Sequence, residues 1–214
     1  MSAAAERAAL LVIAKAPVAG RSKTRLTPPF TPEQAAALAE AALADTLAAV
    51  RAVPDCRRVL VLEGEPGEWL ADGFEIVPQR TGGLDERLAG AFAATDGPAL
   101  LVGMDTPQLS RALLEEGLAA LARPEVDAVI GDAEDGGYWA IGLTLPDARV
   151  FRGVPMSADD TGAAQRARLE ELGLRTVELP PLLDVDTVAD ALSVAAAAPE
   201  SRFARALAAT GVDR

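Results

Sequence analysis

The chain of 214 residues contains no histidine and only one cysteine, Cys56. The lack of histidine excludes a Ser-His-Asp or Cys-His catalytic apparatus, a histidine general base and any histidine-ligated metal. One cysteine can form neither an internal disulfide nor a cysteine-based zinc site. Catalysis would therefore depend on carboxylates, lysine, arginine, hydroxyl groups, backbone amides and a cation bound through oxygen atoms.

Aromatic side chains and positive charges are also scarce. Aromatic residues make up 4% of the chain, and 20 Lys and Arg residues stand against 32 Asp and Glu residues, which gives a net charge of −12. An acidic surface repels phosphate backbones and anionic lipids, so neither nucleic acid nor a membrane is expected as the main partner. A ligand that carries phosphate would need a local cluster of positive charge.

The apolar run near the N-terminus is too short to cross a membrane. It covers residues 8–14, whereas a spanning helix needs about 20 apolar residues, and no cleavage site of a secretory signal follows it. We therefore expect a cytoplasmic protein. The length predicts one large domain over residues 1–214.

Short apolar runs alternate with longer helical patterns along the chain. Strands are expected at residues 10–14, 59–62, 74–77, 99–103, 126–130, 138–143 and 175–179, and helices at about 31–53, 84–94, 110–122 and 158–172, with two more after 187. This alternation of apolar strands and helices predicts an α/β fold, a Rossmann-like domain with a mostly parallel central sheet and helices on both faces. Ligands of such sheets bind beyond the carboxyl ends of the strands. The polar loops after residue 14, at 105 and near 135 are therefore expected to converge on one site.

The loop at residues 15–26 concentrates positive charge in this acidic chain. Its polar and flexible positions are Lys15, Gly20, Arg21, Ser22, Lys23, Thr24 and Arg25. Lysine supplies a point charge and arginine a planar fork for phosphate oxygens, while Gly20 lets the backbone approach an anion closely. The glycine patterns of a Walker A loop and of a dinucleotide fingerprint are both absent. The pattern indicates either a phosphate-binding loop or a solvated basic turn that balances nearby acids.

Two aspartate-containing segments are candidates for metal binding. Asp105 follows a predicted strand and could bind Mg²⁺ or Mn²⁺ and bridge it to phosphate oxygens, although an Asx turn or a helix cap explains it equally well. The segment 184–187, Asp-Val-Asp-Thr, is followed by Asp190. Its alternative explanation is helix capping, with Thr187 or Asp186 at the helix start and Asp190 in the first turn, and capping and metal binding can coexist.

The stretch at residues 134–138, Glu-Asp-Gly-Gly-Tyr, follows another predicted strand. Its two glycines leave room for a substrate against the backbone, and Asp135 offers a hydrogen-bond acceptor or a base. A simple hairpin turn explains Asp-Gly-Gly equally well. Both interpretations stay open at this point.

These motifs occur in an order that resembles a known family. They read Lys-Ala-Pro-x-x-Gly-x-x-Lys-Thr-Arg-Leu at 15–26, Gly-x-Asp-Thr-Pro at 103–107, Glu-Asp-Gly-Gly-Tyr at 134–138 and Asp-Val-Asp-Thr at 184–187. The chain resembles, over about residues 11–192, a bacterial DUF2064-type family generally described as glycosyltransferases, within the nucleotide-diphospho-sugar transferase (GT-A) superfamily. It is more distantly similar to molybdenum-cofactor nucleotidyltransferases and to the guanylyltransferase of deazaflavin-cofactor synthesis.

The resemblance implies a division of labour along the chain. Residues of about 8–107 would hold the nucleotide and its phosphates, residues of about 108–192 the acceptor, and the C-terminal helices would cover 187–210. The residues implied to bind the nucleotide and its phosphates are Lys15, Gly20, Lys23, Thr24, Arg25, Gln79 and Arg87. Gln79 and Arg87 would lie near the base and ribose. Two segments depart from the family pattern: 82–85 reads Gly-Gly-Leu-Asp instead of Gly-Asp-Leu-Gly, and 156–160 lacks the usual Trp-Ser.

The resemblance also implies Asp105 and Asp186 as ligands of Mg²⁺ or Mn²⁺. We expect a metal-dependent transferase that moves a sugar from a nucleotide-sugar to a small-molecule acceptor, with Lys23 sharing the charge of the departing group. Asp135 is the candidate to orient or deprotonate the acceptor hydroxyl, and residues 136–138, Gly-Gly-Tyr, are expected to bind the acceptor. One alternative is a nucleotidyltransferase that couples a nucleoside triphosphate to a phosphorylated small molecule and releases pyrophosphate. Another is a catalytically silent nucleotide-binding protein.

Overall fold

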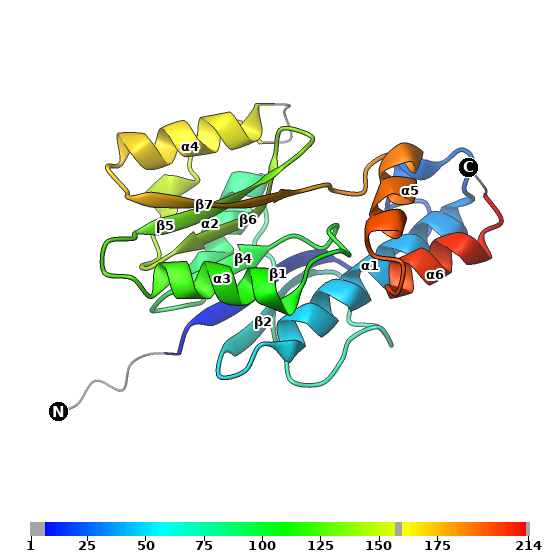
Figure 1. Ribbon diagram of the computed structural model, residues 1–214, viewed down its shortest axis with the longest axis horizontal. Helices are drawn as coiled ribbons and strands as arrows, with labels where there is room; N and C mark the ends of the chain where they lie inside the picture. Colours follow the sequence, from blue (N-terminus) through cyan, green and yellow to red (C-terminus); the bar gives the residue numbers. More distant parts are fainter. Residues whose placement is uncertain (1–6, 157–159, 213–214) are drawn as a thin grey trace.

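The computed structural model describes residues 7–156 and 160–212, in which a seven-stranded sheet carries helices on both faces (Figure 1). The strands are β1 (Ala9–Lys15), β2 (Arg57–Glu63), β3 (Glu75–Pro78), β4 (Ala99–Val102), β5 (Ala128–Ala133), β6 (Tyr138–Leu143) and β7 (Thr176–Leu182). The helices are α1 (Pro32–Ala52), α2 (Leu84–Phe92), α3 (Arg111–Leu121), α4 (Thr161–Glu171), α5 (Val188–Ala197) and α6 (Arg202–Ala209), with short 3-10 turns η1 (Thr24–Leu26) and η2 (Ala148–Val150).

The sheet has the order β3-β2-β1-β4-β6-β5-β7. β6 runs antiparallel to both of its neighbours, and the other pairings are parallel. The predicted α/β fold with a mostly parallel sheet is therefore confirmed. Because β5 and β7 run in the same direction as β1 and β4, the segments that follow β1, β4 and β7 leave the sheet at one edge.

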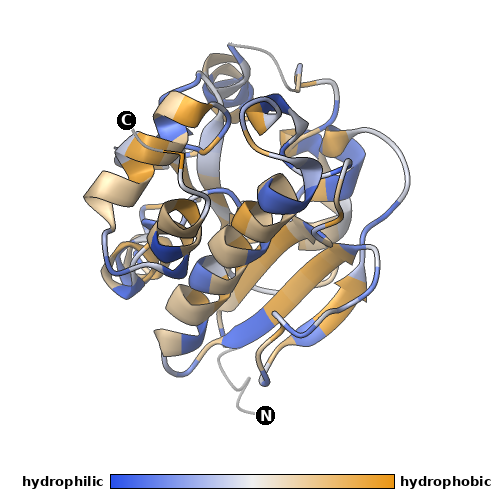
Figure 2. Ribbon diagram, turned by 90° about the vertical axis from the view of Figure 1, so that its right-hand side faces the viewer, coloured by the Kyte–Doolittle hydropathy of each residue, from blue (hydrophilic) through white to orange (hydrophobic). Residues whose placement is uncertain are grey.

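Alternation along each strand separates the core into two layers. Leu10 and Val12 of β1 pack on one face with α1 and α3, whereas Leu11 packs on the other face with residues of α2 and α4. In Figure 2 the sheet strands at the lower right are largely hydrophobic, whereas many of the loops around them are hydrophilic. These two layers fix the strand ends, and thus the site.

A third apolar cluster anchors the loop that follows β1. Leu26 and Phe30 are buried against the start of α1, Val185 and the two C-terminal helices, which lie beside α1 and away from the sheet (Figure 1). Burial of each of these two side chains stabilises the folded protein by roughly 1.5–3 kcal/mol. The polar residues between Lys15 and Leu26 are thereby held over the edge of the sheet.

Several predicted boundaries differ from the structure. The strand expected at 126–130 begins later and extends to Ala133, because the amide of Val126 donates to the carbonyl of Arg123 in a turn. The strand expected at 175–179 continues to Leu182 through two prolines. β7 is an edge strand, where proline costs no hydrogen bond on the open side. The helix expected at 158–172 is α4, and its first predicted residues lie outside the described ones.

The predicted helix caps at Thr31 and Ser110 are confirmed. The hydroxyl of Thr31 accepts from the amide of Gln34, whose side chain accepts from the amide of Thr31, as a capping box requires. The hydroxyl of Ser110 caps α3 by accepting from the amide of Leu113. Among the residues that the structure describes, no helix is long and apolar enough to span a lipid bilayer.

Candidate functional site: a charged pocket at the carboxyl ends of the strands

The segments after β4 and β7 are joined directly at the edge of the sheet. The amide of Val185 donates to the carbonyl of Asp105 at 3.1 Å. Asp186 follows immediately, and Thr187 and Asp190 form the predicted capping box of α5. The two predicted metal ligands, far apart in sequence, therefore stand side by side.

The loop after β1 folds over this edge. The carbonyl of Val18 accepts from the amides of Arg21 and Ser22, and the hydroxyl of Ser22 accepts from the amide of Val18 at 2.9 Å. Gly20 takes a φ of +74° in this turn, a conformation that favours glycine. The turn presents the basic residues that follow it toward Asp105 and Asp186.

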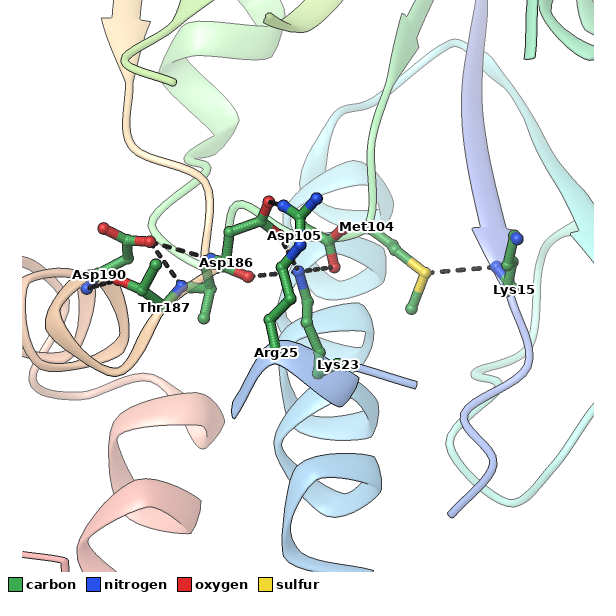
Figure 3. Close-up of polar contacts among 9 residues, drawn as sticks. Lys15, Lys23, Arg25, Met104, Asp105, Asp186, Thr187 and Asp190 are labelled. Carbon is green, nitrogen blue, oxygen red and sulfur yellow. Dashed lines mark hydrogen bonds and ion pairs between the residues drawn. The ribbon is translucent and has the colours of Figure 1, made fainter. Parts of the chain in front are cut away.

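Lys23 lies at the centre of the site (Figure 3). Its ammonium is 3.0 Å from Oδ1 of Asp105 and 3.4 Å from Oδ1 of Asp186, and it donates to the carbonyl of Val185. The side chain is only 10% exposed. Its backbone is left-handed, with φ of 48° and ψ of 42°, which costs about 1 kcal/mol or more for a residue with a Cβ. The surrounding contacts thus hold Lys23 in a strained position that aims its ammonium between two carboxylates.

Arg25 approaches the same pair of acids from the solvent side. Its Nη1 donates to Oδ2 of Asp186 at 2.8 Å, and its side chain is 76% exposed. A pocket of about 240 Å³ lies against these groups. It is lined by Lys15, Arg21, Ser22, Lys23, Thr24, Arg25, Ala39, Met104, Asp105 and Asp186. Lys15, Lys23, Thr24, Arg25, Asp105 and Asp186 are thus brought together as predicted, whereas Gly20 shapes the turn and does not line the pocket.

The electrostatics of the pocket are strongly coupled. Burial alone would lower the pKa of Lys23, but attraction to Asp105 and then to Asp186 outweighs burial and raises that pKa. Burial raises the pKa of Asp184 to about 7, with repulsion from Asp105 and Asp135 adding to the shift. One oxygen of Asp184, Oδ1, is buried without a hydrogen-bond partner. Lys23 thus interacts with three acids, of which Asp105 and Asp186 line the pocket and Asp184 lies behind it.

The donor set fits Mg²⁺ or Mn²⁺. Carboxylate oxygens of Asp105 and Asp186 converge on one positive atom, and hard divalent cations are commonly held by one or two carboxylates together with substrate phosphates. Within the described ranges, no group of three or more acidic or other ligating side chains is close enough to hold a metal by itself. The residues present therefore suit a cation that arrives with phosphate oxygens.

Gln79 and Arg87 form a second polar cluster beside the pocket. Gln79 donates through Nε2 to the carbonyl of Ala14 at 2.6 Å, and Arg87 donates through Nη1 to Oε2 of Glu63 at 2.9 Å. The same Glu63 oxygen is 3.5 Å from the ammonium of Lys15. Arg87 also donates to Oε1 of Gln79 at 3.3 Å, so Gln79 is linked to Lys15 through Arg87 and Glu63. Glu63 was not among the predicted site residues, although an acid at the carboxyl end of a predicted strand is a recognisable signal.

The residues predicted to act on the acceptor, 135–138, do not meet at one site in the structure. Asp135 uses Oδ1 to accept from the amide of Gly137 at 2.9 Å, and the stretch is the hairpin turn between β5 and β6. Tyr138 donates its hydroxyl to Oε1 of Gln165 in α4 and packs on the core layer of α2 and α4. Burial raises the pKa of Tyr138. The structure therefore shows the hairpin turn of the alternative interpretation, and none of residues 135–138 lines the charged pocket.

Asp135 keeps an electrostatic link to the pocket through Asp184, whose pKa it raises. The amide of Glu134 donates to the carbonyl of Leu182, which holds the turn beside the segment that leads to Asp184. Asp184 was part of a recognised motif, but its burial depends on the tertiary fold. Arg21 lines the pocket as well and could have been selected from its place in the basic loop.

The fold and this pocket define a transferase with the architecture of the nucleotide-diphospho-sugar transferases. A crystal structure from Desulfovibrio desulfuricans G20, provisionally named a nucleotide-diphospho-sugar transferase, has a TM-score of 0.78 and 26% identity, over 86% of this chain and 84% of that chain. The chain belongs to the family described as "Uncharacterized protein conserved in bacteria (DUF2064)", whose model matches residues 46–158. The family resemblance and the prediction of a transferase are thus confirmed.

Two further relatives extend the comparison. A phosphoenolpyruvate guanylyltransferase from Conexibacter woesei is 32% identical over 169 residues, which cover 72% of this chain and 73% of the relative. The manganese complex of a protein from Mycobacterium tuberculosis H37Rv has the same general fold, with a TM-score of 0.50 and 21% identity over 89% of this chain and 98% of that chain. The first of these relatives is a nucleotidyltransferase by name, and the second shows the shared fold.

Proposed function

We propose that this protein is a divalent-metal-dependent nucleotidyltransferase that joins a nucleoside triphosphate to a phosphorylated small molecule and releases pyrophosphate. The observation that carries the proposal is the pocket in which Lys23 and Arg25 meet the carboxylates of Asp105 and Asp186. The guanylyltransferase relative supports this reaction over sugar transfer.

The pocket has the charges that a triphosphate needs. Lys15, Arg21, Lys23 and Arg25 line it on the side of the loop, so they can share the negative charge of the β- and γ-phosphates. Asp105 and Asp186 would hold Mg²⁺ or Mn²⁺ against the same phosphates, and the bound cation would neutralise charge on the leaving group. Thr24 lines the same pocket, and its hydroxyl would donate to a phosphate oxygen.

The reaction balances without an added base. A phosphate oxygen of the acceptor attacks the α-phosphorus of the nucleotide, the bond from that phosphorus to the oxygen bridging to the β-phosphate breaks, and pyrophosphate leaves with the bonding electrons. Lys23 and Arg25 stabilise the charge that develops on pyrophosphate. A phosphate acceptor is already ionised at neutral pH, so no side chain has to remove a proton.

The state of Asp135 agrees with a reaction of this kind. Its carboxylate accepts from the amide of Gly137 within its own turn and does not line the pocket. Sugar transfer to a hydroxyl would call for a general base, and Asp135 was the candidate for that role. Attack by an ionised phosphate leaves Asp135 with the lesser task of shaping the turn.

Gln79 and Arg87 are proposed to border the base and ribose. Gln79 directly follows β3, and Arg87 lies within α2. Both are next to β2 and Lys15, at the same edge of the sheet as the pocket. The residues after β5, including Gly136 and Gly137, would then border the acceptor, on the far side of β4. We further propose that both parts belong to one domain.

Sugar transfer is the second candidate, supported by the provisional name of the Desulfovibrio desulfuricans structure. The two reactions differ in their products, because nucleotidyl transfer releases pyrophosphate and sugar transfer releases a nucleoside diphosphate. The test supplies each common nucleoside triphosphate, or a panel of nucleotide-sugars, with phosphoenolpyruvate and other phosphorylated small molecules in Mg²⁺ or Mn²⁺.

Pyrophosphate formed in equal amount to a nucleotidylated acceptor, identified by mass spectrometry, is the expected result. The Asp105→Asn variant serves as the matched control and should lose this turnover. Release of a nucleoside diphosphate from a nucleotide-sugar would instead establish sugar transfer. Nucleotide binding without any turnover across the panel would favour the silent nucleotide-binding protein.

A further inference from the structure

The ammonium of Lys23 stands where a cation shared by two carboxylates belongs. It is 3.0 Å from Asp105 and 3.4 Å from Asp186, and nine-tenths of its side chain is buried (Figure 3). It also donates to the carbonyl of Val185. The atoms that would bind a divalent cation are therefore already occupied by a positive group of this chain.

A divalent cation cannot join Lys23 at this position. Two positive groups a few ångströms apart in a partly buried site repel each other strongly, because the effective dielectric constant there is well below that of water. The carboxylates would also have to divide their lone pairs between the two.

The pocket also offers the ammonium of Lys23 a second place to bind. Arg21, Thr24 and Arg25 line the adjoining space of about 240 Å³, which would be filled by phosphates under the proposed function. A lysine side chain has a long and flexible stem, so its ammonium can move between neighbouring partners while its backbone stays in place. Phosphate oxygens would replace the carboxylates as partners of the ammonium.

We propose that Lys23 is a built-in cation that occupies the metal position while no nucleotide is bound, and that it moves onto the phosphates when nucleotide and metal arrive together. This inference rests on the proposed site for metal and phosphate. It makes metal binding depend on nucleotide, since nucleotide removes the competing charge, and linkage requires that metal strengthens nucleotide binding by the same factor. The free protein would bind Mn²⁺ weakly.

The test measures Mn²⁺ binding to the whole chain without any nucleotide, by electron paramagnetic resonance of free Mn²⁺. Lys23→Met keeps most of the side-chain volume and removes the charge, so it should bind Mn²⁺ at least about tenfold more tightly than the natural protein. Mn²⁺ should likewise raise the melting temperature of Lys23→Met and leave that of the natural protein nearly unchanged. Lys23→Gln should behave as Lys23→Met does, and provides a second reading if the methionine variant folds poorly.

Lys15→Met is the matched control, because Lys15 lines the same pocket but pairs with Glu63 instead of the two aspartates. Its affinity for Mn²⁺ should stay close to that of the natural protein. Adding Asp186→Asn to Lys23→Met should abolish the gain. No gain in either Lys23 variant, or an equal gain in Lys15→Met, would overturn the inference. Because no substrate is turned over, failure of the proposed reaction and failure of this inference are told apart.

Discussion

Asp184 offers a test of the electrostatics of the pocket by pH alone. Its pKa rises from an ordinary 3.8 to about 7, first through burial and then through repulsion from Asp105 and Asp135. Each pKa unit corresponds to about 1.4 kcal/mol, so ionising Asp184 costs on the order of 4 kcal/mol more in the folded protein than in the unfolded chain. The amide of Asp184→Asn has nearly the same shape and never ionises.

The direction in which pH changes the free energy of unfolding depends on which state, folded or unfolded, holds the proton of Asp184. Below about pH 4, Asp184 is protonated in the folded and unfolded states, and its contribution to stability is complete. Between about pH 4 and pH 7 the unfolded chain loses the proton while the folded protein keeps it, so the free energy of unfolding falls as the pH rises. Above about pH 7 both states are ionised and the full penalty is present.

Urea unfolding of the natural protein and of Asp184→Asn at pH 4.5, 6 and 8, in the presence of a chelator, measures this effect. The stability advantage of the variant should be smallest at pH 4.5, about 1 kcal/mol, and should grow to about 4 kcal/mol at pH 8. Other acids titrate in both proteins and cancel in the difference. A difference that is the same at all three pH values would refute the burial and crowding assigned to Asp184.

Three further predictions concern the loop, the hairpin and helix α4. Lys23→Ala and Arg25→Ala should each weaken nucleotide binding in calorimetry by roughly 1–3 kcal/mol, more for triphosphates than for monophosphates; equal losses for all nucleotides would leave only general electrostatics. Arg25→Ala should change folding stability by less than about 1 kcal/mol, because this side chain is largely exposed. Asp135→Asn should keep both nucleotide affinity and turnover, since the amide oxygen still accepts from Gly137; a fall in turnover of about 10²–10⁴ would make Asp135 a general base after all. Gly162→Ala should destabilise the protein in denaturant unfolding by roughly 1–3 kcal/mol, because its Cβ would lie 2.7 Å from the carbonyl oxygen of Gly137; an unchanged midpoint would contradict the close packing of α4 on the hairpin.

The fold and the main charged groups could be predicted from the sequence for a simple reason. Apolar strands alternating with helices dictate a mostly parallel sheet, and such a sheet gathers the loops after its strands at one edge. The basic loop, Asp105 and Asp186 were placed there by this rule and by the motifs. The structure does bring them into one pocket.

The other features of the site could not be predicted, because they depend on contacts between segments that are far apart in the sequence. The ion pair between Lys23 and Asp186 forms only because Leu26 and Phe30 pin the loop against the C-terminal helices. The orientation of Tyr138 follows from which face of the sheet each residue of β6 occupies, and a motif of adjacent letters carries no such information. The glycines beside it serve the turn, and pattern alone left this undecided.

The proposed function requires a cation held by Asp105 and shared with nucleotide phosphates. Calorimetric titration of GTP, with and without Mn²⁺, into the natural protein and into Asp105→Asn tests this most directly. The natural protein should bind GTP more tightly in Mn²⁺, and Asp105→Asn should keep its fold and its metal-independent affinity while losing that gain. The same gain in Asp105→Asn, or no gain in the natural protein, would contradict the account.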